Sequence, residues 1–396
     1  MTEKLLITLT PTDYYFFGGE ETFDDSSGTI RNYLVRSNPL PQQTALVGLL
    51  RHILLNNGRD IGDYSFRAEW PTNDFGDLQT ISPIFLQKGE GDTRRFLLPA
   101  TKLWLKNGQE ITVAFQHAAG KGFTGNDLEN VPTLEFFDSE KNKNVSYTAK
   151  ERPGAYWTFL DDGTNVPAEF EWENNNPKTG RHNGGIFQSS LHIGIDKLSR
   201  MKPRSDAEKQ SKPDDEAFYK QGFFCLAEDY RFAVVAEFDL AKDENPADFA
   251  RMFNTTMSFG GENRSFIIRA EAWTDALRQK FEQQKAFPAH TDQRIVLTSD
   301  AFVDDPQQLL ACCRFTAIGT KPFRNIRVNR TDYSARTFAN LHRKKNPGLL
   351  HLFERGSVFF PKDGSAQKII DLLTAPQHFR EIGYNHFYTQ NQPFTI

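Results

Sequence analysis

The sequence contains no uninterrupted apolar segment that approaches the roughly 20 residues a membrane-spanning helix requires. Its first residues show a short alternating pattern of Leu5, Ile7 and Leu9, which differs from the long apolar stretch of a secretory signal. We therefore expect a cytoplasmic protein that makes no contact with a membrane.

Cysteine is scarce as well. Cys225, Cys312 and Cys313 form no CxxC pair, so neither a disulfide framework nor a zinc knuckle is expected. The nine histidines show no HExxH or comparable metal-ligand spacing. The sequence also lacks a Walker loop and a serine-nucleophile elbow. We expect no metal, no cofactor and no catalytic residue.

An excess of positive charge is also missing. The formal net charge of −4 over 396 residues argues against a general, free-standing binder of nucleic acids. Any site for a polyanion must therefore be a local patch. The length suffices for two or more domains, and 38% apolar with 25% charged residues is typical of soluble globular proteins. Most of the 35 phenylalanines are expected in the core.

Hydrophobic periodicity predicts a chain that opens with a strand over residues 4–12 and a helix over residues 43–56. Leu46, Leu49 and Ile53 lie on one face of that helix. Strands and helices are mixed in both halves without a regular βαβ repeat, which indicates an α+β fold. The further strands expected are 78–86, 95–98, 111–115, 191–195, 265–272, 294–299 and 356–360, with a hairpin of 218–225 and 231–240 and helices at 275–284 and 366–373.

Residues 123–175 are polar and acidic, with eleven Asp or Glu against four Lys or Arg. The Asn-rich stretch from Glu173 to Pro177 is typical of a loop. We interpret this region as an insertion or connector.

The strongest electrostatic signal is the segment 321–345, in which eight cations face one acid, Asp332. Phe323, Tyr333 and Phe338 are interleaved with them, and cations beside rings suit single-stranded RNA. A solvated loop, or a surface that docks onto an acidic protein, fits the charge equally well. The cations are Lys321, Arg324, Arg327, Arg330, Arg336, Arg343, Lys344 and Lys345.

A second basic cluster follows the strand that contains His192. A basic loop at this place can wrap a nucleic-acid strand, and its composition fits a disordered surface loop as well. Its cations are Lys197, Arg200, Lys202, Arg204, Lys209 and Lys212.

Two glycine-containing stretches carry weaker signals. Gly260 and Gly261 would let the backbone approach a phosphate that Arg264 could pair with, and a structural tight turn explains the same residues. Residues 120–125 fit GxGxxG, but no helix of sufficient length follows, so we interpret this match as a coincidental loop. His52, on the first helix, is either a general acid/base or a solvated histidine.

Several motifs, in their order along the chain, carry a family resemblance. They are the opening residues 7–20, the prolines and first helix at 38–51, the stretch 192–196 followed by 216–219, the segment 259–264, and the C-terminal elements 355–360 and 383–385. Together they resemble the third Cmr subunit of type III-B CRISPR effector complexes, a member of the RAMP superfamily. The resemblance spans nearly the whole chain.

The resemblance implies two ferredoxin-like (RRM-like) RAMP domains with inserted loops. We assign residues 1–185 to an N-terminal domain with the acidic insertion and residues 186–396 to a C-terminal domain with the basic loops. It also implies a non-catalytic subunit that holds the 5′ handle of the guide RNA (crRNA) and contacts the large polymerase-like Cmr subunit. A backbone RAMP subunit is a further expected partner, and target RNA a further expected contact.

Residue by residue, the resemblance carries an RNA-binding role to the central loop and to two glycine-containing motifs. To these we add two cations of the basic segment, on charge alone. The complete set is His192, Lys197, Arg200, Lys202, Arg204, Gly260, Gly261, Arg264, Lys321, Arg324, Arg355 and Gly356.

Three alternatives stay open at this point. The chain could be a CRISPR repeat endoribonuclease that uses His52, or the equivalent subunit of a type III-A complex. It could also be a scaffolding protein whose segment 321–345 docks onto an acidic partner.

Overall fold

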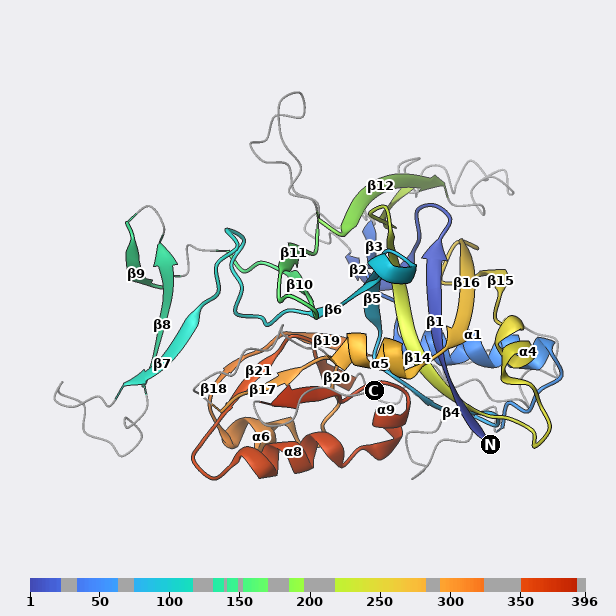
Figure 1. Ribbon diagram of the computed structural model, residues 1–396. Helices are drawn as coiled ribbons and strands as arrows, with labels where there is room; N and C mark the ends of the chain where they lie inside the picture. Colours follow the sequence, from blue (N-terminus) through green and yellow to red (C-terminus); the bar gives the residue numbers. More distant parts are fainter. Residues whose placement is uncertain are drawn as a thin grey trace, which may run out of the picture.

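The structure is a computed structural model and is shown in Figure 1. It describes residues 1–22, 34–62, 75–116, 131–138, 141–148, 152–169, 185–195, 218–282, 293–323 and 350–389.

The first part of the fold is a β-α-β-β-α-β path around one antiparallel sheet, which we call circuit A. Its spatial order is β5–β14–β1–β16, and each neighbouring pair is antiparallel. Strand β4 pairs with β14 beside β5, and β15 pairs with β16 at the sheet edge. The elements are β1 (Thr2–Pro11), α1 (Gln43–Asn56), β4 (Leu78–Ile81), β5 (Phe85–Lys88), β14 (Tyr230–Asp239), α4 (Pro246–Arg251), β15 (Thr255–Ser258) and β16 (Ser265–Ala272).

Strand β1 lies at the centre of circuit A because apolar residues occupy both of its faces. Leu5, Ile7 and Leu9 are fully buried in the same core as α1, whereas Leu6 belongs to a different core on the opposite face. The apolar stripe on α1 predicted from the sequence is buried as expected, and the helix has the predicted bounds. The opening strand and helix of the sequence-based prediction are therefore confirmed.

A long insertion separates β5 from β14, the two strands that a simple hairpin would join. Part of it extends the sheet of circuit A beyond β5, in the order β6–β10–β11, and part forms the three-stranded sheet β7–β8–β9. Its last two strands, β12 and β13, pair with β3 and β2, which lie between β1 and α1 in the chain, in a sheet of order β12–β13–β3–β2. The elements are β2 (Phe17–Thr22), β3 (Leu34–Asn38), β6 (Arg95–Pro99), β7 (Thr112–Gln116), β8 (Val131–Asp138), β9 (Lys143–Ser146), β10 (Tyr156–Phe159), β11 (Asn165–Pro167), β12 (Phe187–Ile195) and β13 (Phe218–Leu226), with a 3-10 turn at Gly91–Thr93.

The hairpin expected from residues 218–225 and 231–240 is wrong. Both strands exist, but β13 pairs with β12 and β3, while β14 pairs with β1, β4 and β5. The short connection between β13 and β14 passes from one sheet to another. Alternating side chains identify a strand but carry no information about its neighbours, which explains the error.

The last third of the chain repeats the same path, and we call it circuit B. Its spatial order is β18–β21–β17–β22, again antiparallel between neighbours. A separate two-stranded ladder, β19–β20, leaves the path between β18 and β21. The elements are β17 (Ile295–Leu297), α6 (Pro306–Ala311), β18 (Cys313–Ala317), β19 (Thr320–Phe323), β20 (Leu350–Phe353), β21 (Val358–Pro361), α8 (Ala366–Thr374), α9 (Gln377–Glu381) and β22 (Phe387–Thr389).

The two circuits face each other through their sheets (Figure 1). One apolar cluster takes Leu6, Phe85 and Val235 from circuit A and Phe360 and Tyr388 from circuit B. Helix α5 (Asp275–Glu282) adds Phe281, whose ring packs on Phe85 at 5.0 Å between centroids. In each sheet, the face opposite the helices is thus buried against the other circuit.

The expected division of the chain at residue 185 does not coincide with a break between sheets. Strand β1 is hydrogen-bonded along its length to β14 and β16, which follow residue 185. Circuit A ends with β16 and circuit B begins with β17, and α5 lies between them. The acidic region 123–175 contributes strands β8 to β11 and belongs to the insertion within circuit A.

Gly356 joins the two circuits and should tolerate no side chain. Its φ is +77°, and an added Cβ would lie 2.4 Å from the carbonyl oxygen of Ala100 in circuit A. Gly364 has a similar φ of +73° with nothing within 4 Å, which makes it a matched control. In urea denaturation, Gly364→Ala should lower the free energy of unfolding by about 1 kcal/mol. Gly356→Ala should lower it by a further ~1–3 kcal/mol. Equal losses of unfolding free energy in the two variants would contradict the close approach of Gly356 to Ala100.

Candidate nucleic-acid interface

Five of the residues expected to bind RNA lie outside the described part of the chain: Lys197, Arg200, Lys202, Arg204 and Arg324. The other seven fall into two separate groups. His192 lies on β12, and Gly260, Gly261 and Arg264 lie in the turn between β15 and β16. Lys321 lies on β19, and Arg355 and Gly356 lie between β20 and β21. Figure 1 shows where these strands lie.

The first group is organised around the ring of Phe223 on β13. His192 on β12 packs against this ring at 4.5 Å between centroids, and Tyr14 meets His192 edge-on at 5.3 Å. The guanidinium carbon of Arg264 lies 4.8 Å from the centre of the Phe223 ring. Phe16 contacts the same ring at 5.4 Å. We call Tyr14, Phe16, His192, Phe223 and Arg264 the apical cluster.

The strand register explains why these side chains meet. His192 is paired with Gln221, and Ser190 with Phe223, across the antiparallel β12–β13 ladder. Paired residues, and residues two apart, project from the same face of a sheet. His192, Gln221 and Phe223 therefore share one face, and Ser190 Oγ lies 3.1 Å from His192 Nε2.

Arg264 reaches this face from the turn between β15 and β16. Its charge is placed over a ring, and cation–π contact stabilises an arginine without neutralising it. Its Nε atom is buried and has no hydrogen-bond partner among the described residues. An arginine held in this way keeps its capacity to pair with a phosphate.

The two glycines of the turn bring the backbone close to the chain's own first loop. Gly261 N–H donates to the carbonyl oxygen of Phe16 at 2.8 Å. Gly260 has a φ of +84°, and an added Cβ would lie 2.6 Å from the same oxygen. The glycines thus position Arg264 beside Phe223, and the close approach that the structure contains is to Phe16.

The sequence-based prediction omitted Tyr14, Phe223, Gln221 and Glu262 from this site. Gln221 Nε2 donates to Glu262 Oε1 at 3.2 Å, which links β13 to the glycine turn. The aromatic-rich opening from Tyr14 to Phe17 and the alternation along β13 were visible signals. Only the pairing of β12 with β13 brings them to one place.

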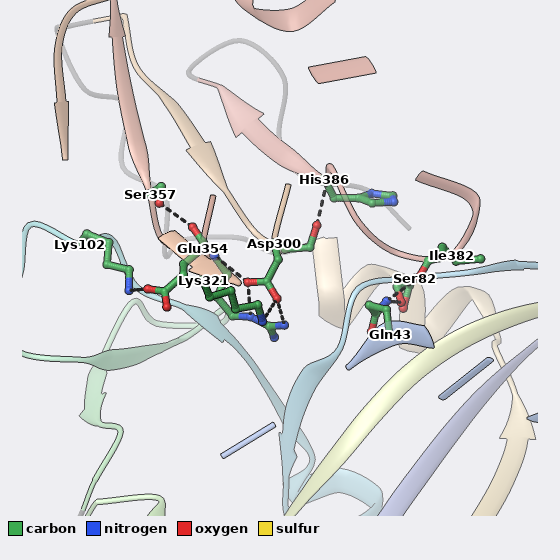
Figure 2. A network of polar contacts seen from close by, with 11 residues as sticks. Gln43, Ser82, Lys102, Asp300, Lys321, Glu354, Ser357, Ile382 and His386 are labelled. Carbon is green, nitrogen blue, oxygen red and sulfur yellow. Dashed lines mark hydrogen bonds and ion pairs between the residues drawn. The ribbon is translucent and has the colours of Figure 1, made fainter. Parts of the chain in front are cut away.

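The second group belongs to an ion-pair network around Asp300 (Figure 2). Asp300 is buried, with 3% of its side chain exposed, and it pairs with Lys321 and with Arg355 Nη2, the latter at 3.0 Å. The Arg355 backbone N–H donates to Asp300 Oδ1 at 3.0 Å. Lys102 pairs with Glu354 at 2.5 Å, which ties circuit A to the same turn.

Two opposing effects act on the Asp300 carboxyl. Burial alone would raise its pKa, but the charges and hydrogen bonds of Arg355 and Lys321 outweigh burial and hold the pKa far below the ordinary range. The carboxylate is therefore ionised at all ordinary pH values. Both cations are engaged by a buried carboxylate, and Gly356 is enclosed against Ala100, so this group has a clear structural role.

His52, the candidate acid/base of the endoribonuclease alternative, lies exposed on α1. Its Nε2 is 3.3 Å from Asn56 Nδ2, one helical turn away. Among the described residues no group of three His, Cys, Asp or Glu side chains could hold a metal ion. No helix in that part of the chain is long and apolar enough to cross a membrane.

These features define an α+β protein with two matching antiparallel circuits and a cation–aromatic surface at one end of circuit A. The chain belongs to the Cas_Cmr3 family of CRISPR-associated proteins, whose family description matches residues 7–391. The resemblance to the third Cmr subunit of type III-B complexes, drawn from the motifs, is thereby confirmed.

Two solved structures contain chains that align with this chain at low sequence identity. A chain in a cryo-EM structure of the Type III-B Cmr-beta bound to cognate target RNA shares 14% sequence identity with it. The alignment covers 100% of this chain and 99% of that one, with a TM-score of 0.45. A chain of the Csm3-Csm4 subcomplex in the type III-A CRISPR-Cas interference complex shares 9% identity over 90% of this chain and 93% of that one, with a TM-score of 0.33. No curated protein matches this chain.

Replacing Asp300 should test the structural role of Arg355 and Lys321. Asp300→Asn leaves two cations without their buried carboxylate and should lower the free energy of unfolding by about 3–5 kcal/mol at pH 7. Asp363→Asn, on an exposed turn, is the matched control and should change it by less than about 0.5 kcal/mol. A loss no larger than that of the control would contradict the structural role.

The same variant should differ less from the wild type in acid. A carboxyl with a depressed folded-state pKa stabilises fully above its ordinary pKa of about 4 and progressively less below it. The wild type should therefore lose about 1 kcal/mol of this contribution between pH 7 and pH 3, whereas the amide of Asp300→Asn has no such contribution to lose. Urea denaturation at the two pH values measures the difference, which should be narrower at pH 3.

Proposed function

We propose that this chain is a non-catalytic RNA-binding subunit of a type III-B CRISPR effector complex, and that it holds the 5′ handle of the guide RNA. In the same proposal it contacts the large polymerase-like subunit and a backbone RAMP subunit, works in the cytoplasm, and takes part in antiviral defence. Family membership over residues 7–391 is the first support.

We further propose that circuits A and B are the two ferredoxin-like domains expected of a RAMP protein. Each follows a β-α-β-β-α-β path. If the four strands of a circuit are numbered in chain order, they lie across the sheet in the order 2-3-1-4. The boundary between the domains then falls between α5 and β17. The insertion between β5 and β14 accounts for the length of the first domain.

The apical cluster is the surface that suits RNA best. RRM-type proteins stack bases on an open sheet face. Here the sheet face of circuit A opposite its helices is covered by circuit B, so side chains such as Phe85 and Val235 are buried. Contacts to RNA must then come from loops and from the β12–β13 sheet.

One observation carries the proposal: His192, Phe223 and Arg264 converge where β12 ends, and the basic segment with Lys197, Arg200, Lys202 and Arg204 follows at once in the sequence. The half-buried rings of Tyr14 and His192, which can stack on bases, are thus placed beside charges that can pair with phosphates, and the buried Phe223 ring positions His192 and Arg264. Lys321 and Arg355 are not part of this surface in the proposal because Asp300 engages both. Target RNA is a further proposed contact of the assembled complex.

Neutralising the basic segment should weaken the binding of guide RNA. A Lys197→Ala, Arg200→Ala, Lys202→Ala, Arg204→Ala variant should bind with lower affinity and a smaller salt dependence. The slope of log K against log salt should fall by about 0.7 for each lost phosphate contact. Fluorescence anisotropy of the full chain with labelled guide RNA at several salt concentrations measures both.

The matched control removes the same number of exposed cations away from the apical cluster: Lys242, Arg251, Lys362 and Lys368. It should bind like the wild type. Equal losses in both variants would reduce the effect to net charge and would contradict a local site.

The endoribonuclease alternative is tested directly. Full-length chain incubated with CRISPR repeat RNA should leave the RNA uncut, and His52→Ala should bind guide RNA as the wild type does. Specific cleavage that disappears in His52→Ala would overturn the non-catalytic assignment. The type III-A alternative is decided by which subunits and which RNA co-purify with the chain.

A further inference from the structure

Glu262 lies in an unexpected place for an acidic residue. It is exposed at the tip of the β15–β16 turn, two residues before Arg264. Its hydrogen-bond donor, Gln221, is paired across the sheet with His192 of the apical cluster. A carboxylate beside a phosphate-binding surface repels the backbone of RNA and lowers affinity. A compensating attraction to another part of the RNA would offset that cost.

The backbone at this residue is also under strain. Glu262 and Asn263 have φ values of +61° and +52°. Asn tolerates this left-handed region, but Glu does not favour it, and Gly, Asn or Asp would fit the turn better. Strained residues persist where the surrounding structure and function hold them. The turn thus carries a side chain that its own geometry disfavours.

The carboxylate of Glu262 is held in one direction, and only part of its hydrogen-bonding capacity is used. Gln221, of which 9% is exposed, donates to Oε1 and fixes the direction of the carboxylate. Among the described residues the structure gives Glu262 no ion pair with Arg264 or His192. Each carboxylate oxygen accepts more than one hydrogen bond, so both oxygens retain acceptor capacity toward solvent.

We propose that Glu262, positioned by Gln221, reads a guanine base of the guide RNA held at the apical cluster. This inference rests on the proposed RNA-binding function and specifies the base. The Watson–Crick edge of guanine presents two adjacent N–H donors, at N1 and N2, that match the two oxygens of a carboxylate. Adenine, cytosine and uracil present at most one donor group beside an acceptor, and that acceptor faces the carboxylate unfavourably.

In this arrangement Arg264 holds a phosphate, and the rings of His192 and Tyr14 lie beside the base. Backbone contacts set the position of an RNA strand, and base-edge contacts supply its sequence preference. Glu262 is therefore a specificity-determining residue, and Gln221 is a positioning residue that acts through it.

The test changes the hydrogen-bonding pattern of the side chain at residue 262 and keeps its shape. Glu262→Gln replaces two acceptors by one acceptor and one donor, a pattern that pairs with adenine. Full-length wild type and variant are titrated with guide RNAs in which each position of the 5′ segment carries each of the four bases in turn. Glu228→Gln, an exposed carboxylate on the connection between β13 and β14, is the control for the lost charge.

For the wild type and for Glu228→Gln, one position should prefer guanine over the other bases by about 5- to 100-fold in affinity. Glu262→Gln should lose this preference at the same position, with adenine bound at least as well as guanine. A purely structural role for Glu262 would weaken all RNAs alike and leave the preference in place, which overturns the proposal.

The result also separates this inference from the proposed function. Tight binding of guide RNA by the wild type without a preferred base at any position contradicts the role of Glu262 and leaves RNA binding intact. If no guide RNA is bound, the proposed function and this inference both fail.

Discussion

The contact between the two sheets is the constraint from which the other features follow. Circuit A places its helices on one face of its sheet, and the opposite face meets the sheet of circuit B through Phe85, Val235, Phe360 and Tyr388. Burying this much aromatic and aliphatic surface stabilises the pair of circuits strongly. It also removes from solvent the sheet face with which related RNA-binding folds stack bases. In the proposed function, the RNA-binding surface lies instead where the β12–β13 sheet meets the β15–β16 hairpin.

The same contact between the sheets explains the structural role of the Asp300 network. A carboxylate with two cations is buried at this junction, where removing one partner would leave an uncompensated charge in a medium of low dielectric constant. Lys102 pairs with Glu354 at the same turn, and Gly356 is enclosed against Ala100, so polar and steric constraints fix one relative placement of the circuits. The family resemblance predicted an RNA contact for Arg355 and Gly356. In the fold both residues lie at the contact between the two circuits.

The sequence supported local predictions better than spatial ones. The bounds of α1 were correct because Leu46, Leu50 and Ile53 repeat with helical periodicity and are buried together. The hairpin of β13 and β14 failed because alternation is a property of one strand, whereas pairing is decided by partners more than a hundred residues away, such as Leu6 with Val235. The division at residue 185 failed to match the sheets for the same reason, since an insertion separates two strands that a short turn would otherwise join.

The candidate site shows the same limit at the level of single residues. His192 was named as a candidate through the family resemblance, and Arg264 through the resemblance and its charge. Phe223 and Gln221 are ordinary strand residues until the register of β12 on β13 is known. Arg355 carries the same chemistry as Arg264, and their partners distinguish them. Arg355 meets a carboxylate, and Arg264 meets a ring.

That difference bears on how a chain with net charge −4 could bind a polyanion locally, as proposed. Several arginines are neutralised locally, as in the pairs of Arg59 with Asp77, of Arg94 with Glu271 and of Arg95 with Asp161. Arg264 is instead held by the Phe223 ring, which orients the guanidinium and leaves its charge available. The net charge of such a protein therefore does not predict the electrostatic field at a local site. The field at a site depends on whether each cation is fixed by an anion or by an aromatic ring.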